Sequence, residues 1–208
     1  LHLGIYERFV FPRLLDCACG VKPIARQREK VVPLAKGRVL EVGLGSGLNL
    51  AHYRADQVDA LIGLEPSSSL GLVATRRARE QDLPLVLLEA SAEQIPLAER
   101  SVDSVVITYA LCTIPEPSAA IAEFHRVLRP GGRLLLSEHG LAPDPGVRRW
   151  QHAMDRLWPH VSGGCHVNRD MAALLGQGGF DTGPLQRGYI PGPRPLSYNY
   201  WGALTRRG

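Results

Sequence analysis

The chain has few cysteines and no strong excess of either charge. Its four cysteines fit neither a disulfide framework nor the spacing of a zinc site, so we expect a reducing compartment and no metal site. The net charge of +4 is modest, and basic residues are scattered among acidic ones rather than gathered in a run. This distribution favours an ordinary solvated surface over a nucleic-acid-binding one, so we expect no nucleic-acid partner.

Long hydrophobic runs are also missing. No apolar stretch approaches the roughly 20 residues that cross a bilayer, and no signal peptide is visible, so we expect a cytoplasmic protein. The sequence starts at Leu1 without Met, which suggests that its natural N-terminus lies further upstream. With 208 residues, of which 45% are hydrophobic, the chain can bury a full core, and we expect one domain over residues 1–208.

The first part of the chain has an amphipathic pattern, which predicts a helical lid or cap over residues 1–33. The apolar residues at close to helical spacing are Leu3, Tyr6, Phe9, Val10, Leu14 and Cys17. A lid would bring Tyr6 and Phe9 over a substrate pocket and exclude water from it. The same helix could instead pack against the core, or make a peripheral contact with a membrane surface.

Apolar runs then alternate with helical patterns. The runs predict strands at residues 38–42, 60–64, 85–88, 104–108 and 133–137, and the helical patterns lie at 48–53, 67–81 and 117–128. Pro130-Gly131-Gly132 is expected to stop the third of these helices. This alternation predicts an α/β fold with a Rossmann-like, doubly wound sheet of about seven strands and helices on both faces.

The end of the chain predicts a change in strand direction. Residues 145–160 and 168–177 have helical patterns, and Asn168 could cap the second helix. Two late segments, 181–190 and 197–205, resemble strands joined by a Gly/Pro-rich turn. Strands joined without a crossover helix run antiparallel, so we expect a mostly parallel sheet with a late antiparallel strand.

The most informative segment is the glycine loop Gly43-Leu44-Gly45-Ser46-Gly47, directly after the first predicted strand. Its glycines allow a tight turn and close approach of the backbone to a ligand. Glu41 precedes the loop, and Glu65 follows the second strand where an acidic side chain can meet a ribose. The loop is tighter than the Gly-x-Gly-x-x-Gly of a nicotinamide oxidoreductase, which makes that alternative the weaker one.

From about Lys36 to Glu138 the sequence resembles the class I S-adenosylmethionine-dependent methyltransferases. The resemblance rests on segment 41–47, Glu65, Ala92-Glu93, Asp103 and segment 125–132; Ser91 stands where the family usually has Asp. It implies S-adenosyl-L-methionine as cofactor and S-adenosyl-L-homocysteine as product. The cofactor-binding residues that it implies are Glu41, Gly43, Gly45, Gly47, Asn49, Glu65, Pro66, Ala92, Glu93 and Tyr109.

A narrower resemblance, to the methyltransferase-like thiol S-methyltransferases, covers nearly the whole chain. It rests on segments 6–8, 12–15, 111–113, 137–139 and 164–166 and on Trp158. Animal members carry an N-terminal membrane anchor, which we do not expect in this chain. The resemblance implies a small, apolar acceptor, with a thiol as the most specific hypothesis. A phospholipid head group, a quinone or another O- or N-acceptor stays open, as does a non-catalytic cofactor-binding subunit.

The predicted acceptor site combines histidines with apolar side chains. A thiolate is the nucleophile in thiol chemistry, and a neutral histidine or a buried polar network could take the proton. His139 is the first candidate and His166 the second. Besides Tyr6 and Phe9, we expect Cys112 and Trp158 to line the substrate pocket, and Trp150 could join them. No oligomeric state is predicted.

Overall fold

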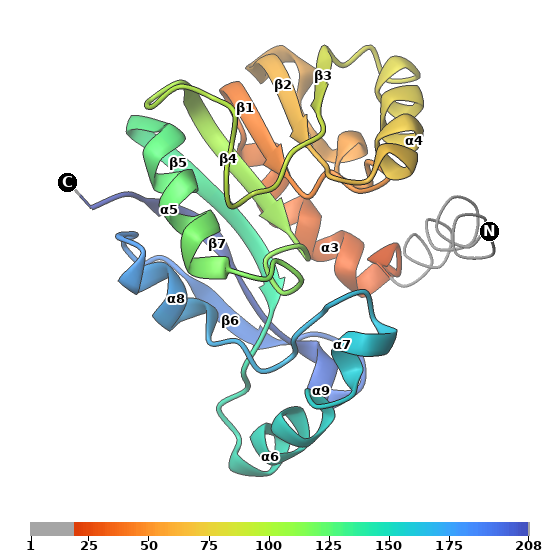
Figure 1. The fold of residues 1–208 in the computed structure, drawn as a ribbon, viewed down its shortest axis with the longest axis vertical. Coiled ribbons are helices and arrows are strands. Elements are labelled where there is room, and N and C mark those ends of the chain that lie inside the picture. The colour runs from red at the N-terminus through yellow and green to blue at the C-terminus, as the bar shows by residue number, and fades with distance from the viewer. Residues whose placement is uncertain (1–18, 208) are drawn as a thin grey trace.

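The computed structural model describes residues 19–207, which form a sheet with helices on both faces (Figure 1). The strands are β1 (Gly37–Val42), β2 (Val58–Leu64), β3 (Leu85–Leu88), β4 (Val102–Thr108), β5 (Leu128–His139), β6 (Gln186–Tyr189) and β7 (Tyr198–Thr205). Their order in the sheet is β3-β2-β1-β4-β5-β7-β6. The first five strands run parallel, whereas β7 runs antiparallel to both β5 and β6. The predicted fold class is therefore confirmed.

Helices pack on both faces of this sheet. They are α3 (Lys22–Val31), α4 (Ser68–Arg79), α5 (Pro117–Val127), α6 (Pro145–Met154), α7 (Trp158–Val161), α8 (Met171–Gln177) and α9 (Arg194–Ser197), with short 3-10 turns η2 (Val32–Leu34), η3 (Leu50–His52) and η4 (Ala55–Gln57). Side chains from α5 and α8 share one hydrophobic cluster, and those from α3 and α4 share another. Val105 and Ile107 point into the first cluster and Val106 into the second, because successive side chains of a strand alternate between faces.

Three predicted boundaries are wrong. The helix expected over 145–160 is two helices, α6 and α7, because Pro159 lacks the N–H that a continuous helix needs and is accepted only in the first turn of a new one. Helix α8 begins at Met171 and is capped by Asp170, whose carboxylate accepts a 3.1 Å hydrogen bond from the Ala173 N–H, rather than by Asn168.

The end of α5 also differs from the prediction. This helix ends at Val127, ahead of the Pro130-Gly131-Gly132 segment that was expected to stop it. Leu128 already has extended geometry and pairs with Val102. The Pro-Gly-Gly segment instead lies within β5, where the pairing with β4 shifts register and Gly131 has a φ of +79°.

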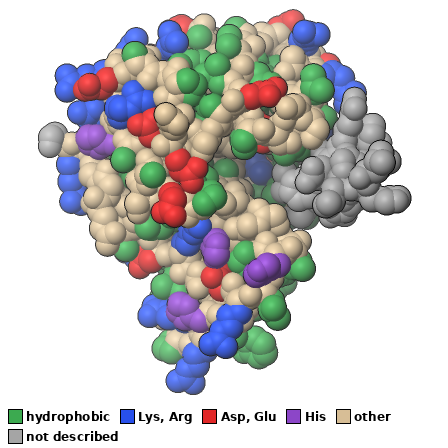
Figure 2. Space-filling view, in the orientation of Figure 1, with side chains coloured by type: hydrophobic (Ala, Val, Ile, Leu, Met, Phe, Trp, Pro, Cys, Tyr) green, Lys and Arg blue, Asp and Glu red, His purple; other side chains and the backbone are tan. Residues whose placement is uncertain are grey.

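The face in Figure 2 mixes acidic and basic side chains rather than gathering basic ones in a stripe. Within residues 19–207, no helix is long and apolar enough to cross a membrane. The predicted N-terminal segment, with Tyr6 and Phe9, lies largely outside the described residues.

Candidate functional site

Two adjoining hollows lie where parallel strands end. The larger is lined by segments that follow β1, β2, β3 and β4, including Gly43, Gly45, Glu65, Pro66, Ala92, Glu93, Tyr109 and Thr113. The smaller is lined by residues in and before α3, by the segment after β1 and by the end of β4, including Gly43, Gly45, Asn49, Arg28, Cys19 and Tyr109. Gly43, Gly45 and Tyr109 line both hollows, so they mark the junction. The carboxyl edge of an open α/β sheet is where such proteins bind ligands.

The glycine loop has the tight, left-handed backbone that its glycines allow. Gly43, Gly45 and Gly47 have φ values of +67°, +57° and +85°, a region that glycine adopts without steric cost. A Cβ at Gly43 would lie 2.4 Å from the Ala110 Cβ, and one at Gly47 would lie 2.6 Å from Leu50. At Gly45 the nearest atom would be the Gly43 carbonyl oxygen at 3.9 Å. Gly45 therefore leaves open space at the junction, while the other two glycines are needed for packing.

Glu65 connects this loop to the end of β2. Its carboxylate accepts hydrogen bonds from the backbone N–H of Gly45 at 2.8 Å and of Ser67 at 2.9 Å. Burial raises the pKa of Glu65, and the two backbone hydrogen bonds oppose that shift. Each carboxylate oxygen can accept more than one hydrogen bond, so both can still receive a ribose hydroxyl. The Ser67 hydroxyl contacts Ser69 and makes no side-chain cap on α4.

Glu41 lies beneath the glycine loop. Its carboxylate accepts hydrogen bonds from Asn49 Nδ2 at 3.0 Å and from the Tyr53 hydroxyl at 2.7 Å, and Asn49 Oδ1 accepts one from Thr108. Burial raises the pKa of Glu41 to about 7, although these hydrogen bonds oppose the shift. Glu41 thus holds the residues on either side of η3 in place, and Asn49 lines the smaller hollow. Direct contact between Glu41 and a cofactor stays a prediction.

Arg28 is a site residue that the sequence analysis missed. It is only 4% exposed, and its guanidinium lies 5.3 Å from the centre of the Tyr109 ring. One guanidinium nitrogen donates to the Cys19 carbonyl at 2.6 Å, while Nε is buried without a hydrogen-bond partner. Among the described residues that line the smaller hollow, Arg28 is the one with a formal charge. A buried cation there fits a ligand carboxylate.

The segment after β3 lines the larger hollow with Ser91, Ala92 and Glu93. Ala92 is buried and Glu93 is partly exposed. The Ser91 hydroxyl donates to the Glu93 carboxylate, which also accepts a 2.9 Å hydrogen bond from the Glu116 N–H. These two hydrogen bonds lower the pKa of Glu93. Ser91 therefore orients Glu93, whose carboxylate stays charged beside the hollow.

Tyr109 is held at the junction in an uncommon conformation. Its φ is +52°, a region that side-chain-bearing residues seldom adopt without support from their surroundings. The support comes from its N–H, which donates to the Ser137 carbonyl at 2.9 Å, and from its hydroxyl, which donates to Asn199 at 2.6 Å. The Tyr109 ring stacks on His139, with centroids 6.4 Å apart and planes at 21°.

Beyond Tyr109, two cysteines and a histidine meet. Cys165 Sγ lies 3.2 Å from His139 Nε2, and these two atoms and Cys112 Sγ all lie within 4.8 Å of one another. Hydrogen bonds with Cys112 and His139 hold the pKa of Cys165 well below its usual range. The indole N–H of Trp158 lies close to Cys165 and contributes to that shift, but it is buried without a partner within hydrogen-bond distance.

Glu138 positions the segment that contains Cys112 and is a second residue that the site prediction omitted. It is fully buried, and one carboxylate oxygen accepts hydrogen bonds from the N–H groups of Ala110 and Leu111, at 2.6 and 2.7 Å. Burial raises the pKa of Glu138 to about 7. An acidic residue at the end of an apolar strand was the available sequence signal, as it was for Glu41.

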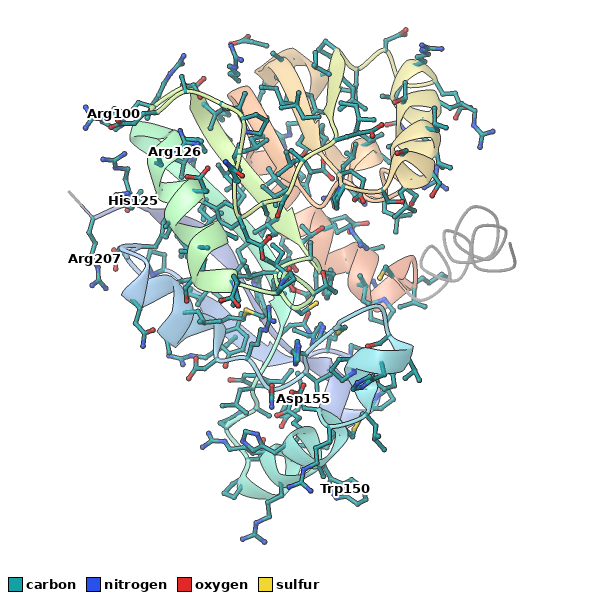
Figure 3. All side chains as sticks on the ribbon, viewed as in Figure 1. Arg100, His125, Arg126, Trp150, Asp155 and Arg207 are labelled. Carbon is teal, nitrogen blue, oxygen red and sulfur yellow. The ribbon has the colours of Figure 1, made fainter. Side chains whose placement is uncertain are left out.

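Other predicted acceptor residues have different surroundings. The imidazole of His166 bonds to Asp155 through Nδ1 at 2.9 Å, and the backbone N–H of His166 donates to the Cys112 carbonyl. Like Cys112, His139 and Trp158, it lines neither hollow. Asp155 lies just beyond the end of α6 (Figure 3). Trp150 is 67% exposed and points away from the body of the molecule (Figure 3), so the suggestion that it lines the acceptor pocket is wrong.

Comparisons with known proteins place the chain among methyltransferases. A family model described as a methyltransferase domain matches residues 40–136. Thiol S-methyltransferase TMT1A of Homo sapiens is 30% identical over 176 residues, which are 81% of this chain and 71% of that protein. Thiol S-methyltransferase TMT1B of Rattus norvegicus is 31% identical over 136 residues, which are 64% and 55%. The match to the rat protein thus covers little more than half of its length.

Other relatives act on other acceptors. The ubiquinone/menaquinone biosynthesis C-methyltransferase UbiE of Syntrophotalea carbinolica is 30% identical over 138 residues, which are 62% of this chain and 56% of that protein. A solved structure of an S-adenosylmethionine-dependent methyltransferase from Thermotoga maritima has a TM-score of 0.66 and covers 99% of both chains. At 19% identity, that likeness shows the fold.

The two hollows fit the parts of S-adenosyl-L-methionine. Glu65 can accept ribose hydroxyl protons, the buried Arg28 can meet the carboxylate of the amino-acid end, and Gly45 leaves room for the ligand between them. The relative of 30% identity, most of whose length this chain covers, agrees with the family match and the fold. The chain therefore belongs to the class I S-adenosylmethionine-dependent methyltransferases, with S-adenosyl-L-methionine as its cofactor.

Proposed function

We propose that this protein transfers the methyl group of S-adenosyl-L-methionine to a small, apolar thiol and releases S-adenosyl-L-homocysteine. The observation that carries this proposal is the contact of Tyr109, at the junction of the two hollows, with His139, which in turn contacts Cys165. The segments that contain His139, Cys112 and Cys165 also carry the similarity to thiol S-methyltransferases. These segments are far apart in the sequence and meet beside the cofactor cleft.

The charges in the cleft set the proposed direction of the cofactor. Ribose binds at Glu65 in the larger hollow, and the amino-acid carboxylate binds at Arg28 in the smaller one. The sulfonium lies between these two ends of the molecule, so it belongs at the residues that both hollows share, Gly43, Gly45 and Tyr109. Its methyl group would then lie on the Tyr109 side, within reach of an acceptor next to His139.

The cofactor supplies a methyl group that is already activated, so the protein mainly aligns the acceptor and excludes water. The acceptor must react as a thiolate. We propose that His139 accepts the thiol proton, because its ring stacks on Tyr109 at the junction of the two hollows. His166 remains the second candidate, although its ring faces Asp155. Tyr6 and Phe9 stay predicted pocket residues, because they lie outside the described part of the chain.

A quinone or another O-, N- or C-nucleophile is the second candidate acceptor. The relative UbiE, whose name describes a C-methyltransferase of quinone biosynthesis, favours it. Both candidate acceptors use the same cofactor residues, so the side chains next to the acceptor distinguish them. Cys112, Cys165 and His139 line neither hollow, but His139 stacks on Tyr109 at their junction. Two thiols and a histidine there suit a soft sulfur nucleophile.

The test is S-adenosyl-L-homocysteine formation with a panel of acceptors: alkyl thiols, hydrogen sulfide, a quinol and a phospholipid amine. We expect turnover with the thiols. Turnover with the quinol or the amine alone would overturn the thiol proposal and support the second candidate. Cofactor binding by calorimetry without turnover on any acceptor would instead support a non-catalytic, cofactor-binding subunit.

A further inference from the structure

We propose that Cys112, His139 and Cys165 form a site for one soft divalent cation of the zinc type, and that its open coordination position takes the acceptor thiol. The second half of this statement rests on the proposed function; the first half does not. Within residues 19–207, this is the one group of three or more Cys, His, Asp or Glu side chains close enough to hold an ion together.

The distances suit zinc. Zinc lies about 2.3 Å from a thiolate and about 2.0–2.1 Å from an imidazole nitrogen, so tetrahedral geometry places its ligand atoms about 3.5–3.8 Å apart. Cys165 Sγ and His139 Nε2 are 3.2 Å apart, and all three ligand atoms lie within 4.8 Å of one another. Side-chain shifts of up to about 1 Å would complete the geometry.

The backbone around the site is fixed before any ion binds. Glu138 accepts hydrogen bonds from the two N–H groups that precede Cys112 in the chain. Arg169 donates to the carbonyls of Leu111 and Ile114, at 2.5 and 2.7 Å, on either side of Cys112. The Cys112 carbonyl accepts from the His166 N–H at 2.9 Å, which joins the segment after β4 to the one that contains Cys165. This bracing holds the ligands on three separate segments close together.

The ligand types select the class of ion. Two thiolates and an imidazole favour zinc and other soft ions, whereas magnesium and calcium require oxygen ligands. No carboxylate belongs to the group. The negative charges of the two thiolates would also balance the charge of a divalent ion. The ion and its three protein ligands together would therefore carry no net charge in the buried site.

Three protein ligands leave one position open, as in catalytic zinc sites. The three ligands line neither hollow, but His139 stacks on Tyr109 at their junction. The proposal therefore requires the open position to face Tyr109. A thiol bound to such an ion loses its proton to solvent and stays as the thiolate. Its sulfur then forms a bond to the methyl carbon while the bond from that carbon to the sulfonium breaks, giving a thioether and S-adenosyl-L-homocysteine. In this arrangement the ion replaces His139 in promoting loss of the thiol proton, which His139 would accept only in the metal-free protein.

Sequence spacing could not reveal this site. Zinc motifs are recognised when pairs of ligands lie a few residues apart. Here each ligand comes from a different segment: after β4, at the end of β5, and after α7. Only the parallel pairing of β4 and β5 and the return of the chain after α7 bring them together.

The first experiment measures bound metal independently of turnover. Reduced protein would be loaded with zinc under anaerobic conditions, desalted, and analysed by mass spectrometry of the elements. We expect one zinc ion per chain, and at least a tenfold loss of bound zinc in Cys112→Ser and Cys165→Ser. The matched controls Cys19→Ser and His160→Ala should keep the ion. Less than a tenth of an ion per wild-type chain, or full retention in both cluster variants, would overturn the site.

A second measurement does not depend on the folding of a variant. Wild-type protein would be treated with iodoacetamide with and without zinc, and each cysteine read by peptide mass mapping. Zinc should protect Cys165, the more exposed of the two cysteines; equal modification of Cys165 in both samples would overturn the site. Cobalt in place of zinc should give a thiolate-to-metal charge-transfer band that changes when an alkyl thiol is added. An unchanged band would overturn the acceptor position.

The outcomes separate this inference from the proposed function. Zinc bound by the cluster in a protein that methylates no thiol would leave the metal site standing and refute thiol methylation. Full thiol turnover by the metal-free protein would support thiol methylation and refute the role of the ion in it.

Discussion

The backbone N–H of Gly45 donates a 2.8 Å hydrogen bond to Glu65 Oε2. This bond joins the loop after β1 to the end of β2 at the point where the two hollows meet. The residue that we propose for ribose binding therefore also sets the position of the glycine that leaves room for the cofactor. Disturbing either partner should affect cofactor binding before it affects the fold.

The two loop glycines that line both hollows should respond differently to the same substitution. In Gly45→Ala, the new Cβ would meet no atom closer than 3.9 Å, so the fold should survive with a cost of roughly 1–2 kcal/mol from the left-handed backbone. That Cβ occupies the proposed cofactor space, and we expect at least a tenfold loss of S-adenosyl-L-homocysteine affinity by calorimetry.

Gly43→Ala is the matched variant. Its Cβ would lie 2.4 Å from the Ala110 Cβ, so steric overlap should add about 1–3 kcal/mol to the backbone cost. Thermal unfolding should show a larger loss of stability than for Gly45→Ala. If Gly45→Ala binds the product with unchanged affinity, the cofactor does not approach the loop at that residue.

Glu65→Gln tests the ribose assignment with little change of size. The amide has one acceptor oxygen where the carboxylate has two, so it cannot serve both backbone donors and the ribose hydroxyls. We expect product binding to weaken by roughly 1–3 kcal/mol, the range for a hydrogen bond to a charged group. Glu89→Gln, at the exposed end of the neighbouring strand β3, should bind normally. A loss of turnover with intact product affinity would contradict a ribose role.

Arg28→Gln should separate the two ends of the cofactor. Arg28 is buried beside the smaller hollow, and removing one partner of a buried charge pair costs roughly 2 kcal/mol or more. S-adenosyl-L-homocysteine should therefore bind at least tenfold more weakly. 5′-Methylthioadenosine, which lacks the amino-acid end, should bind the variant and the wild type equally.

Arg26→Gln is the control for that comparison, because Arg26 lies on the same helix and is exposed. Its affinity for both ligands should stay unchanged. Equal losses for the two ligands in Arg28→Gln would mean that Arg28 stabilises the whole cleft rather than recognising a carboxylate.

The site residues that sequence could predict are those with a local signature. Three glycines at this spacing require positive φ wherever they occur, and Glu41 and Glu65 stand at the ends of apolar runs. Arg28 had no such signature, because one basic residue in the segment Lys22–Lys30 resembles its neighbours until α3 packs against β5 and β7.

The same limit applies to the acceptor side. The sequence predicts His139 as a base and Cys112 as a pocket residue, each on its own. Their contact with Cys165 depends on which strands pair and on how the chain returns after α7. The break between α6 and α7 is a smaller case. Pro159 is visible in the sequence, but the helical pattern that leads up to it predicts one helix over 145–160.

Glu41 should make stability depend on pH. Its pKa is raised from 4.5 to about 7 in the folded protein by burial. Between those two values the unfolded chain has lost this proton while the folded chain keeps it, so rising pH favours unfolding.

Glu41→Gln keeps the shape but does not titrate. We therefore expect the stability of the wild type, relative to Glu41→Gln, to fall as pH rises from about 4.5 to 7. The fall should be on the order of 3 kcal/mol at most, at about 1.4 kcal/mol per pKa unit. Urea unfolding of both proteins across this range measures the difference, and parallel stability profiles would show that Glu41 is ionised in the folded state throughout.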